Sequence, residues 1–198
     1  MRADDMDYSH DDDGLAGKLL IAMPGIDDER FAKAVILICA HNDEHAMGIV
    51  LNRAMGDLTL PELLDQLEVP IAAAPPSDPI LLGGPVGKDR GFVIHTDDFE
   101  SIGATIPVGE KLKLTATKEV LQAIASDERP KRCRLALGYS GWGPLQLENE
   151  LKDNVWLVSD ADDEIIFDSD FDGKWERAIR KLGISPSFLQ NSGPAGHA

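Results

Sequence analysis

The sequence RCRLALGYSGWGPLQLE, residues 132–148, contains a strand pattern, a glycine-rich turn and the start of a helix in direct succession. Arg132–Tyr139 is typical of a strand, and the glycines that follow it predict a sharp turn. Gly143-Pro144 favours a helix start, because proline has the φ angle of a first helical turn and needs no backbone N–H there. The spacing therefore predicts a short helix over Leu145–Leu151 and a chain that mixes both kinds of element.

Short apolar segments on both sides of this stretch predict further strands. Ala46–Asn52 follows Ala34–Cys39 after a polar turn that contains His41, which is the pattern of a β-hairpin. The other expected strands are Lys18–Met23, Ile80–Leu82, Gly91–Thr96, Ile102–Ile106, Lys111–Ala116, Val155–Ser159 and Glu164–Asp168. Strands therefore outnumber helices in the expected fold.

Helical spacing of apolar residues is confined to a few segments. Thr59 and Glu62 have the spacing of a capping box at the start of one of them. Gly183 can take the left-handed conformation that ends the last one. Besides Leu145–Leu151, the expected helices are Leu60–Leu67, a helix capped by Thr117, and about Lys174–Leu182.

Length and composition are those of one folded domain. The chain has 198 residues, of which 43% are apolar, and a chain of this size buries about 70% of its unfolded surface. No linker separates two cores, so we expect a single domain over residues 15–190. Residues 1–14 are acidic and lack an apolar stretch, which predicts a disordered tail rather than a signal peptide. Residues 191–198 are small and polar, which predicts a loose C-terminal tail.

Charge and cysteine content disfavour several classes of function. Lys and Arg number 19 and Asp and Glu number 35, so the net charge is −16, the wrong sign for a surface that binds phosphate backbones. Cys39 and Cys133 are too few for a disulfide scaffold and suggest reduced thiols. The longest apolar run, Ala34–Ala40, is too short to span a bilayer. We therefore expect a cytoplasmic protein that binds neither nucleic acid nor a membrane directly.

Two sequence motifs match nucleotide and hydrolase sites only in part. Gly83–Lys88 lacks the first glycine and the final Ser or Thr of a phosphate-binding loop. Ser140 follows a strand as in a nucleophile elbow, but Trp142 replaces the second glycine of that motif. The only histidine after Ser140 is His197. Both segments are therefore interpreted as structural turns.

Two possible metal motifs are also incomplete. Asp168, Asp170 and Asp172 have the spacing of a calcium loop, which makes them a weak calcium candidate. The bidentate Glu of such a loop is absent, and a cap on the last helix explains these carboxylates equally well. Cys39 and the turn histidine lack a second ligand pair for zinc. We expect no metal and no other cofactor.

Gly138–Glu148 differs from these motifs because glycines, two large aromatic residues and polar side chains crowd into one short stretch. Glycines permit close backbone approach, and the following helix start offers free N–H groups to an anion. Gly83-Gly84-Pro85 and Asn52-Arg53 have a similar character. A ligand site and a purely structural corner are both open interpretations. The candidate ligand-binding residues are Asn52, Arg53, Gly83, Gly84, Arg90, His95, Gly138, Tyr139, Gly141, Trp142, Gly143, Gln146 and Glu148.

Several blocks, taken in order, resemble the AlgH-like (YqgE) family of uncharacterised bacterial proteins. The blocks span about Gly17–Ala195 and are Leu19–Pro24, Asp28–Phe31, His41 through Ala46–Gly48 to Leu51–Arg53, Gly83–Val86, Arg90–His95 and Gly138–Glu148. Departures from the family pattern are Glu29, Ala34, Ala54 and Leu145, where the family usually has Pro, Ser, Pro and Gly. The change at residue 34 disfavours any mechanism that needs a hydroxyl there.

The resemblance implies an α+β single domain with a bifurcated, mostly antiparallel sheet folded into a partial barrel and helices packed outside. It implies no established catalytic residues. Our leading hypothesis is a noncatalytic binding or indirect regulatory module, whose Gly/aromatic-rich corner recognises a small ligand or a protein partner.

Two other functions are considered. A hydrolase or transferase could use His95 or Glu148 as a general base beside Ser140, provided that they lie within about 3 Å of the proton to be moved. Direct DNA binding is suggested by the association of the family name with transcriptional regulation. We predict that it is wrong here, because the densest basic stretch, Lys131–Arg134, leads into a strand rather than a recognition helix.

Overall fold

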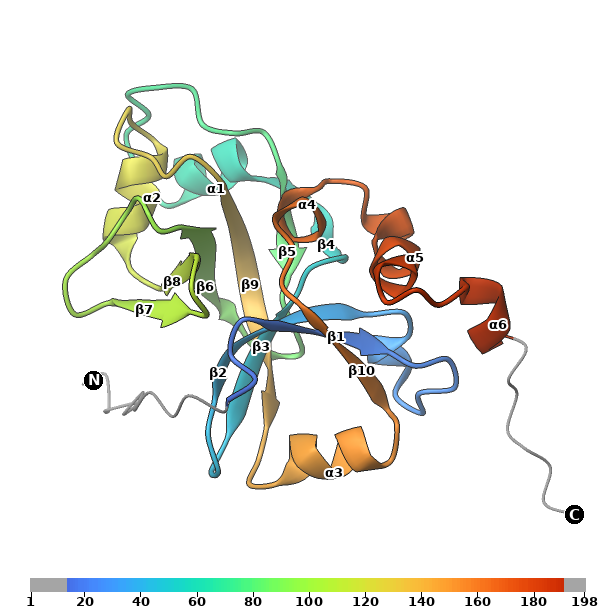
Figure 1. Cartoon of the computed structure of the whole chain (residues 1–198). Helices are drawn as coiled ribbons and strands as arrows, with labels where there is room; N and C mark the ends of the chain where they lie inside the picture. Colours follow the sequence, from blue (N-terminus) through green and yellow to red (C-terminus); the bar gives the residue numbers. More distant parts are fainter. Residues whose placement is uncertain (1–13, 191–198) are drawn as a thin grey trace, which may run out of the picture.

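Strand β9 (Cys133–Trp142) is the central strand of the structure, a computed structural model that describes residues 14–190 (Figure 1). Eight strands follow the order β10-β1-β2-β3-β9-β6-β8-β7, while β4 pairs with β5 and β5 pairs with β9. The other strands are β1 (Lys18–Ala22), β2 (Val35–His41), β3 (Ala46–Val50), β4 (Ala54–Thr59), β5 (Pro79–Leu82), β6 (Val86–Thr96), β7 (Thr105–Val108), β8 (Leu112–Thr115) and β10 (Trp156–Asp160).

The sheet divides along β9. The end of β9 pairs with β3, as in Met47 opposite Gly141. Its earlier part pairs antiparallel with β6, where His95 lies opposite Cys133. β5 pairs with the middle of β9 and is the parallel partner in an otherwise antiparallel sheet, with Leu81 opposite Ala136. The expected bifurcated sheet, curled into a half-barrel, is confirmed.

Most helices pack against the sheet through three apolar clusters, while α6 follows α5 at the edge of the molecule (Figure 1). They are η1 (Glu29–Phe31), α1 (Leu60–Gln66), α2 (Lys118–Ile124), α3 (Gln146–Lys152), α4 (Asp163–Phe167), α5 (Phe171–Lys181) and α6 (Pro186–Gln190). The capping box of α1 is present, because the backbone N–H of Thr59 donates to Glu62 at 2.8 Å. Gly183 has φ +74° after α5, as expected for a left-handed cap.

Three buried apolar clusters join these helices to the sheet. Trp175 of α5 packs with the inner residues of β1 and β2 and also donates its indole N–H to the Ala22 carbonyl at 2.8 Å. Leu147 of α3 packs with Trp142 and Trp156 on a second face. α1 and α2 cover a third cluster over β6 and β9. Burial of each large side chain contributes about 1.5–3 kcal/mol, so the packing fixes the position of every helix.

The structure corrects several sequence-based expectations. The strand expected at Ile102–Ile106 is instead Thr105–Val108, because residues 102–104 form a turn. Glu164–Asp168 is not a strand: Asp163–Phe167 is helical, because Asp162 accepts the free N–H groups of Glu164 and Ile165 at the helix start. β4 was not expected. The predicted turn after Tyr139 is instead a continuation of β9, because residues 140–142 pair with β3. The predicted tails at 1–14 and 191–198 lie, apart from Gly14, outside the described residues.

Candidate functional site

The glycine corner, which we define as Gly83, Gly84 and Gly138, is where the segment after β5 crosses β9. A Cβ on Gly84 would lie closer than 3.0 Å to the Tyr139 carbonyl. Gly138 has φ +75°, and a Cβ there would lie 2.7 Å from the Gly84 oxygen. Two backbone bonds close the crossing, since the Gly83 N–H donates to the Leu137 oxygen and the Gly83 oxygen accepts from Val50, both at 2.9 Å. Packing alone therefore accounts for these three glycines.

An accessible surface remains beside the corner, and we call Arg90, Tyr139 and Gly141 the Tyr139 patch. The Tyr139 ring is partly buried and meets Phe92 edge-on, with ring centres 5.7 Å apart. The guanidinium of Arg90 lies 5.6 Å from the centre of the Phe92 ring, and Arg90 itself is exposed. Gly141 is also exposed. Gly143 and Gln146 are exposed as well, but they hydrogen-bond to each other, so the Tyr139 patch is the part of the candidate site that keeps ligand or partner binding open as a prediction.

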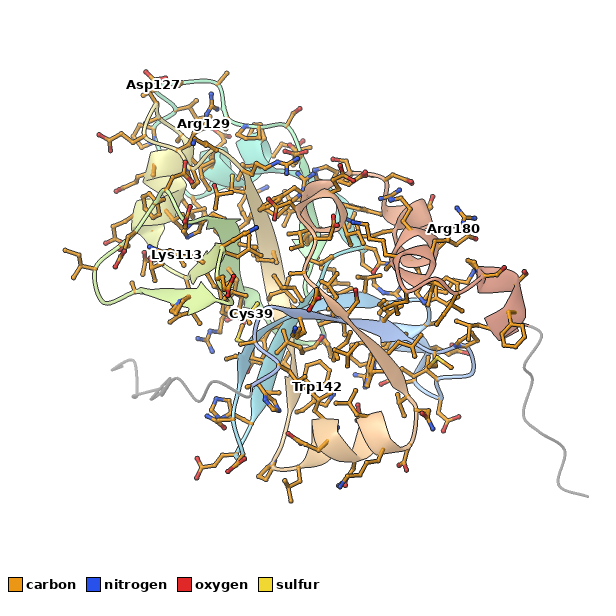
Figure 2. The ribbon with its side chains drawn as sticks, in the orientation of Figure 1. Cys39, Lys113, Asp127, Arg129, Trp142 and Arg180 are labelled. Atoms are coloured by element: carbon orange, nitrogen blue, oxygen red, sulfur yellow. The ribbon has the colours of Figure 1, made fainter. Side chains whose placement is uncertain are left out.

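Glu150, which was not identified from the sequence, joins Trp142, Gly143 and Gln146 in one hydrogen-bond network. Glu150 accepts the indole N–H groups of Trp142 at 2.9 Å and Trp156 at 2.7 Å on one carboxylate oxygen. Its other oxygen accepts from Gln146 at 2.9 Å, whose own oxygen accepts from the Gly143 N–H. The helical spacing of Gln146 and Glu150 was the available signal. This network attaches α3 to the sheet; in Figure 2 Trp142 lies over α3 and far from Arg129.

Glu148 joins α3 to β2 through His41. The Nδ1 atom of His41 accepts from the Leu15 N–H at 3.2 Å, so Nε2 carries the proton that is donated to Glu148 at 2.7 Å. Partial burial alone would raise the pKa of Glu148, but hydrogen bonds from its own backbone N–H and from His41 hold that pKa below its ordinary value. Both ring nitrogens of His41 are thus occupied by contacts within the fold.

His95 is a buried link between three strands. Its Nδ1–H donates to the Thr96 carbonyl at 2.7 Å, and its Nε2 accepts from the Thr115 hydroxyl at 2.8 Å. Thr115 accepts in turn from Thr105 at 2.7 Å. Burial lowers the pKa of His95, which keeps the ring neutral at physiological pH. A general base would need the Nε2 lone pair to accept a proton, but this lone pair already accepts the hydrogen bond from Thr115.

The structure separates His95 from Ser140. His95 lies opposite Cys133, and Ser140 is 140 − 133 = 7 residues further along the same strand. At about 3.3 Å per residue this is roughly 23 Å, far beyond the reach of a proton transfer. The Ser140 hydroxyl is buried and donates to the Gly83 carbonyl at 3.4 Å. The predicted use of His95 as a base for Ser140 is therefore wrong.

Asn52 and Arg53 hold the turn before β2. The Asn52 side chain accepts from the Val35 N–H at 3.0 Å and donates to the Lys33 carbonyl at 2.8 Å. Arg53 donates to the Ala32 carbonyl at 2.8 Å. Lys33 has φ +54°, which is costly for a residue with a side chain, so these bonds stabilise an unfavourable turn.

The aspartates proposed as a weak calcium candidate surround a guanidinium. Arg177 lies 3.3 Å from Asp168 and also pairs with Asp170. Asp170 caps α5 by accepting from the Gly173 N–H at 3.1 Å, which confirms the capping interpretation. Asp172 lies in the first turn of the same helix. In residues 14–190, no three His, Cys, Asp or Glu side chains are grouped to hold a metal ion.

Lys174, beside these aspartates, is fully buried and donates to the carbonyls of Ile165 and Asp168. Desolvation lowers its pKa to about 8, so folding favours the neutral amine. Between pH 8 and pH 10.5 the unfolded chain binds more protons at Lys174, so the contribution of this side chain to stability rises with pH. We expect the stability of wild type relative to Lys174→Met to rise by about 3 kcal/mol over this range, while the two cysteine thiols, whose contribution falls with pH, act equally in both proteins. Denaturant unfolding of wild type and Lys174→Met at several pH values measures it, and equal pH profiles for the two proteins would contradict it.

Neither cysteine has the properties of a reactive thiol. Burial raises the pKa of Cys39 to about 12. Burial, assisted by the charge of Asp78, raises the pKa of Cys133 to about 11. A thiolate is the form that attacks substrates and binds metals, so both side chains remain protonated at neutral pH.

An apolar cavity of about 310 Å³ lies between α1, α2 and the β6–β9 half of the sheet, and we call it the α1–α2 pocket. Leu63, Leu67, Val120, Leu121, Leu135 and Leu137 supply much of its wall. Lys88, Asp89 and Lys118 also line it. In the part of the chain that the structure describes, neither lysine forms an ion pair. Sequence reasoning missed this pocket because its walls come from five separate elements.

Comparison with known proteins decides the family. Residues 19–187 match the model of the AlgH-like family. The chain belongs to the AlgH-like family. A UPF0301 protein of Caulobacter vibrioides (strain NA1000 / CB15N) is 53% identical over 95% of this chain and 97% of its own length. One from Rhodopseudomonas palustris (strain HaA2) is 51% identical over 94% of this chain and 88% of its own length. The resemblance inferred from the sequence is confirmed.

Solved structures show the same AlgH-like architecture. The solution structure of the AlgH protein from Pseudomonas aeruginosa is 40% identical, covers 96% of this chain and 99% of its own, and superposes with a TM-score of 0.73. A crystal structure from Corynebacterium diphtheriae, 18% identical, covers 92% of this chain and 93% of its own with a TM-score of 0.69, and shows the fold alone. Within residues 14–190, no helix has the length and hydrophobicity to span a bilayer.

Proposed function

We propose that this AlgH-like protein is a noncatalytic, cytosolic binding module that accepts a small amphiphilic carboxylate in the α1–α2 pocket. The pocket itself carries the proposal: its volume of about 310 Å³ lies at the lower end of typical ligand sites, and its wall is largely apolar. Lys88 and Lys118 outnumber Asp89 in the lining, so the pocket carries a net positive charge in a protein of net charge −16. A carboxylate with an apolar tail complements both features.

The contacts of the polar candidates support binding rather than catalysis. His95 and His41 use both ring nitrogens within the fold, and the buried Ser140 hydroxyl bonds to a backbone carbonyl. The two thiols have raised pKa values. A nucleophile with a base in reach is the minimum for covalent catalysis, and these residues do not supply it.

The position of the pocket supports an indirect regulatory role. Gly91 and Leu137 line it, and their strands also carry Arg90 and Tyr139 of the Tyr139 patch. A ligand in the pocket would therefore contact β6 and β9, the same two strands that present the Tyr139 patch. We assign the patch to a protein partner, whose binding the ligand would modulate through a shift of conformational populations.

Calorimetric titration with decanoate tests the proposed ligand class. We expect a Kd in the micromolar range, about −8 kcal/mol at 1 μM, and weaker binding of the uncharged decanol. Leu67→Glu should abolish binding, because it places a carboxylate in the wall, and Lys88→Gln/Lys118→Gln should raise the Kd about tenfold. Lys111→Gln/Lys152→Gln, two exposed lysines outside the pocket, is the matched control. Absence of heat at about 1 mM decanoate would refute the proposal.

A further inference from the structure

A second cavity, of about 400 Å³, lies where the chain enters β9, and we call it the β9-entry pocket. Arg129, Lys131, Arg132 and Arg134 line it, together with Asp78 and Phe167. Four cationic side chains around one cavity are unexpected in a protein whose net charge is −16. In the sequence, Lys131–Arg134 is a basic stretch that leads into a strand, and the fold places it around a concave surface.

The cations of this pocket exceed the acids that neutralise them. Asp78 pairs with Arg134 at 2.6 Å. Arg132 lies 3.9 Å from Asp163 and rests over the Phe167 ring at 5.3 Å, so its charge is only weakly compensated. Arg129 donates to the neutral carbonyl of Ala74. The excess positive charge therefore remains available to an anion in the cavity.

Arg134 is the buried member of this set, with 4% of its surface exposed. One terminal nitrogen pairs with Asp78, and the other donates to the Phe167 carbonyl and to the Ser169 hydroxyl. Its Nε–H is buried and has no acceptor among residues 14–190. An unmet donor on a buried charged group is costly, and a water or an anion normally supplies the acceptor.

We propose that the β9-entry pocket binds a small phosphate-bearing anion. Guanidinium groups donate two parallel hydrogen bonds to phosphate oxygens, and three arginines converge here. The Phe167 ring is already covered by Arg132, so recognition rests on the phosphate rather than on stacking with a base. The proposal is independent of the α1–α2 pocket, because the linings of the two cavities share no residue.

A nucleic acid is the competing occupant. Asp78 lies within the pocket, and Asp98 accepts from the Lys131 backbone N–H at 2.9 Å beside it. A continuous phosphate backbone would pass both carboxylates, whereas a small anion inside the cavity meets only Asp78, whose charge is offset by its pairing with Arg134. We therefore expect a compact phosphate compound to bind and a DNA duplex to bind only weakly.

Calorimetric titration of the full chain with inorganic pyrophosphate at low salt tests the assignment. We expect submillimolar binding that weakens at least tenfold in Arg129→Gln/Arg132→Gln, two exposed side chains whose replacement spares the buried Arg134. Arg30→Gln/Arg180→Gln removes the same charge from exposed positions outside the pocket and should stay within twofold of wild type. Unchanged unfolding midpoints would show that both double variants are folded.

Three outcomes would overturn the proposal. If the folded protein does not bind pyrophosphate, the proposal is wrong. If both double variants bound pyrophosphate equally weakly, the binding would reflect general charge attraction rather than a site. If citrate bound as tightly as pyrophosphate, the pocket would have no preference for phosphate. In the same buffer, a DNA duplex that binds more tightly than pyrophosphate, with a steep salt dependence, would replace the small anion by nucleic acid.

Discussion

Replacement of Gly84 by alanine is expected to destabilise the protein by about 4 kcal/mol or to prevent folding. The new Cβ would lie closer than 3.0 Å to the Tyr139 carbonyl and to the Ser140 nitrogen, which are backbone atoms and cannot rotate away. Relief requires that the β5–β6 connection move off β9, which disturbs the Val50 and Leu137 bonds to Gly83. Overpacking against fixed backbone belongs to the small group of mutations with effects this large.

Gly91→Ala is the matched control for this prediction. Gly91 is an exposed glycine on β6, and a Cβ there would meet only leucine side chains of β9 at 3.8 Å, an ordinary contact. We expect a change within about 1 kcal/mol, since alanine also loses less conformational entropy on folding. Guanidinium unfolding followed by circular dichroism measures both variants. A loss below about 1 kcal/mol for Gly84→Ala would contradict the proposed role of the glycine corner.

The sequence correctly predicted those elements that are determined by residues close together in the chain. The hairpin of β2 and β3 and the helix after Thr59 follow from alternation and from a capping box, and both are confirmed. β4 was not predicted because Ala54–Thr59 has no fully buried residue and pairs with β5 in an irregular register. Ile165–Phe167 is a short apolar run that suits a strand or a buried helix equally well. The Asp162 side chain decides in favour of the helix, because it accepts from two free N–H groups at the helix start.

The crowding of the candidate site was visible in the sequence, but its cause was not. Gly83 and Gly138 are far apart along the chain, and only the crossing of β5 and β9 shows why neither tolerates a side chain. The same holds for His41 and Glu148, whose contact spans 107 residues. Both cavities are likewise lined by several distant segments. Sequence patterns identify unusual residues, whereas their partners depend on tertiary contacts.

Loss of the Glu150 carboxylate is expected to cost about 4 kcal/mol of unfolding free energy. Glu150→Ala removes the acceptor of two indole N–H groups and of Gln146, and hydrogen bonds to a charged group contribute about 1.5–3 kcal/mol each before partial compensation by water. Trp142 and Trp156 are each only about one-twentieth exposed, so water reaches their N–H groups poorly. Equilibrium unfolding monitored by tryptophan fluorescence measures the loss directly.

Two further variants separate the acceptor from the rest of α3. Glu150→Gln keeps one oxygen for the indoles but replaces the other by a donor, so we expect a smaller loss of about 1–2 kcal/mol. Asn149→Ala changes the neighbouring exposed residue of α3 and should stay within about 0.5 kcal/mol of wild type. If Glu150→Ala and Asn149→Ala unfolded at the same denaturant concentration, the glutamate network would not be what holds α3 to the sheet. Trp142, Gly143 and Gln146 would then have to be reconsidered as parts of a binding surface.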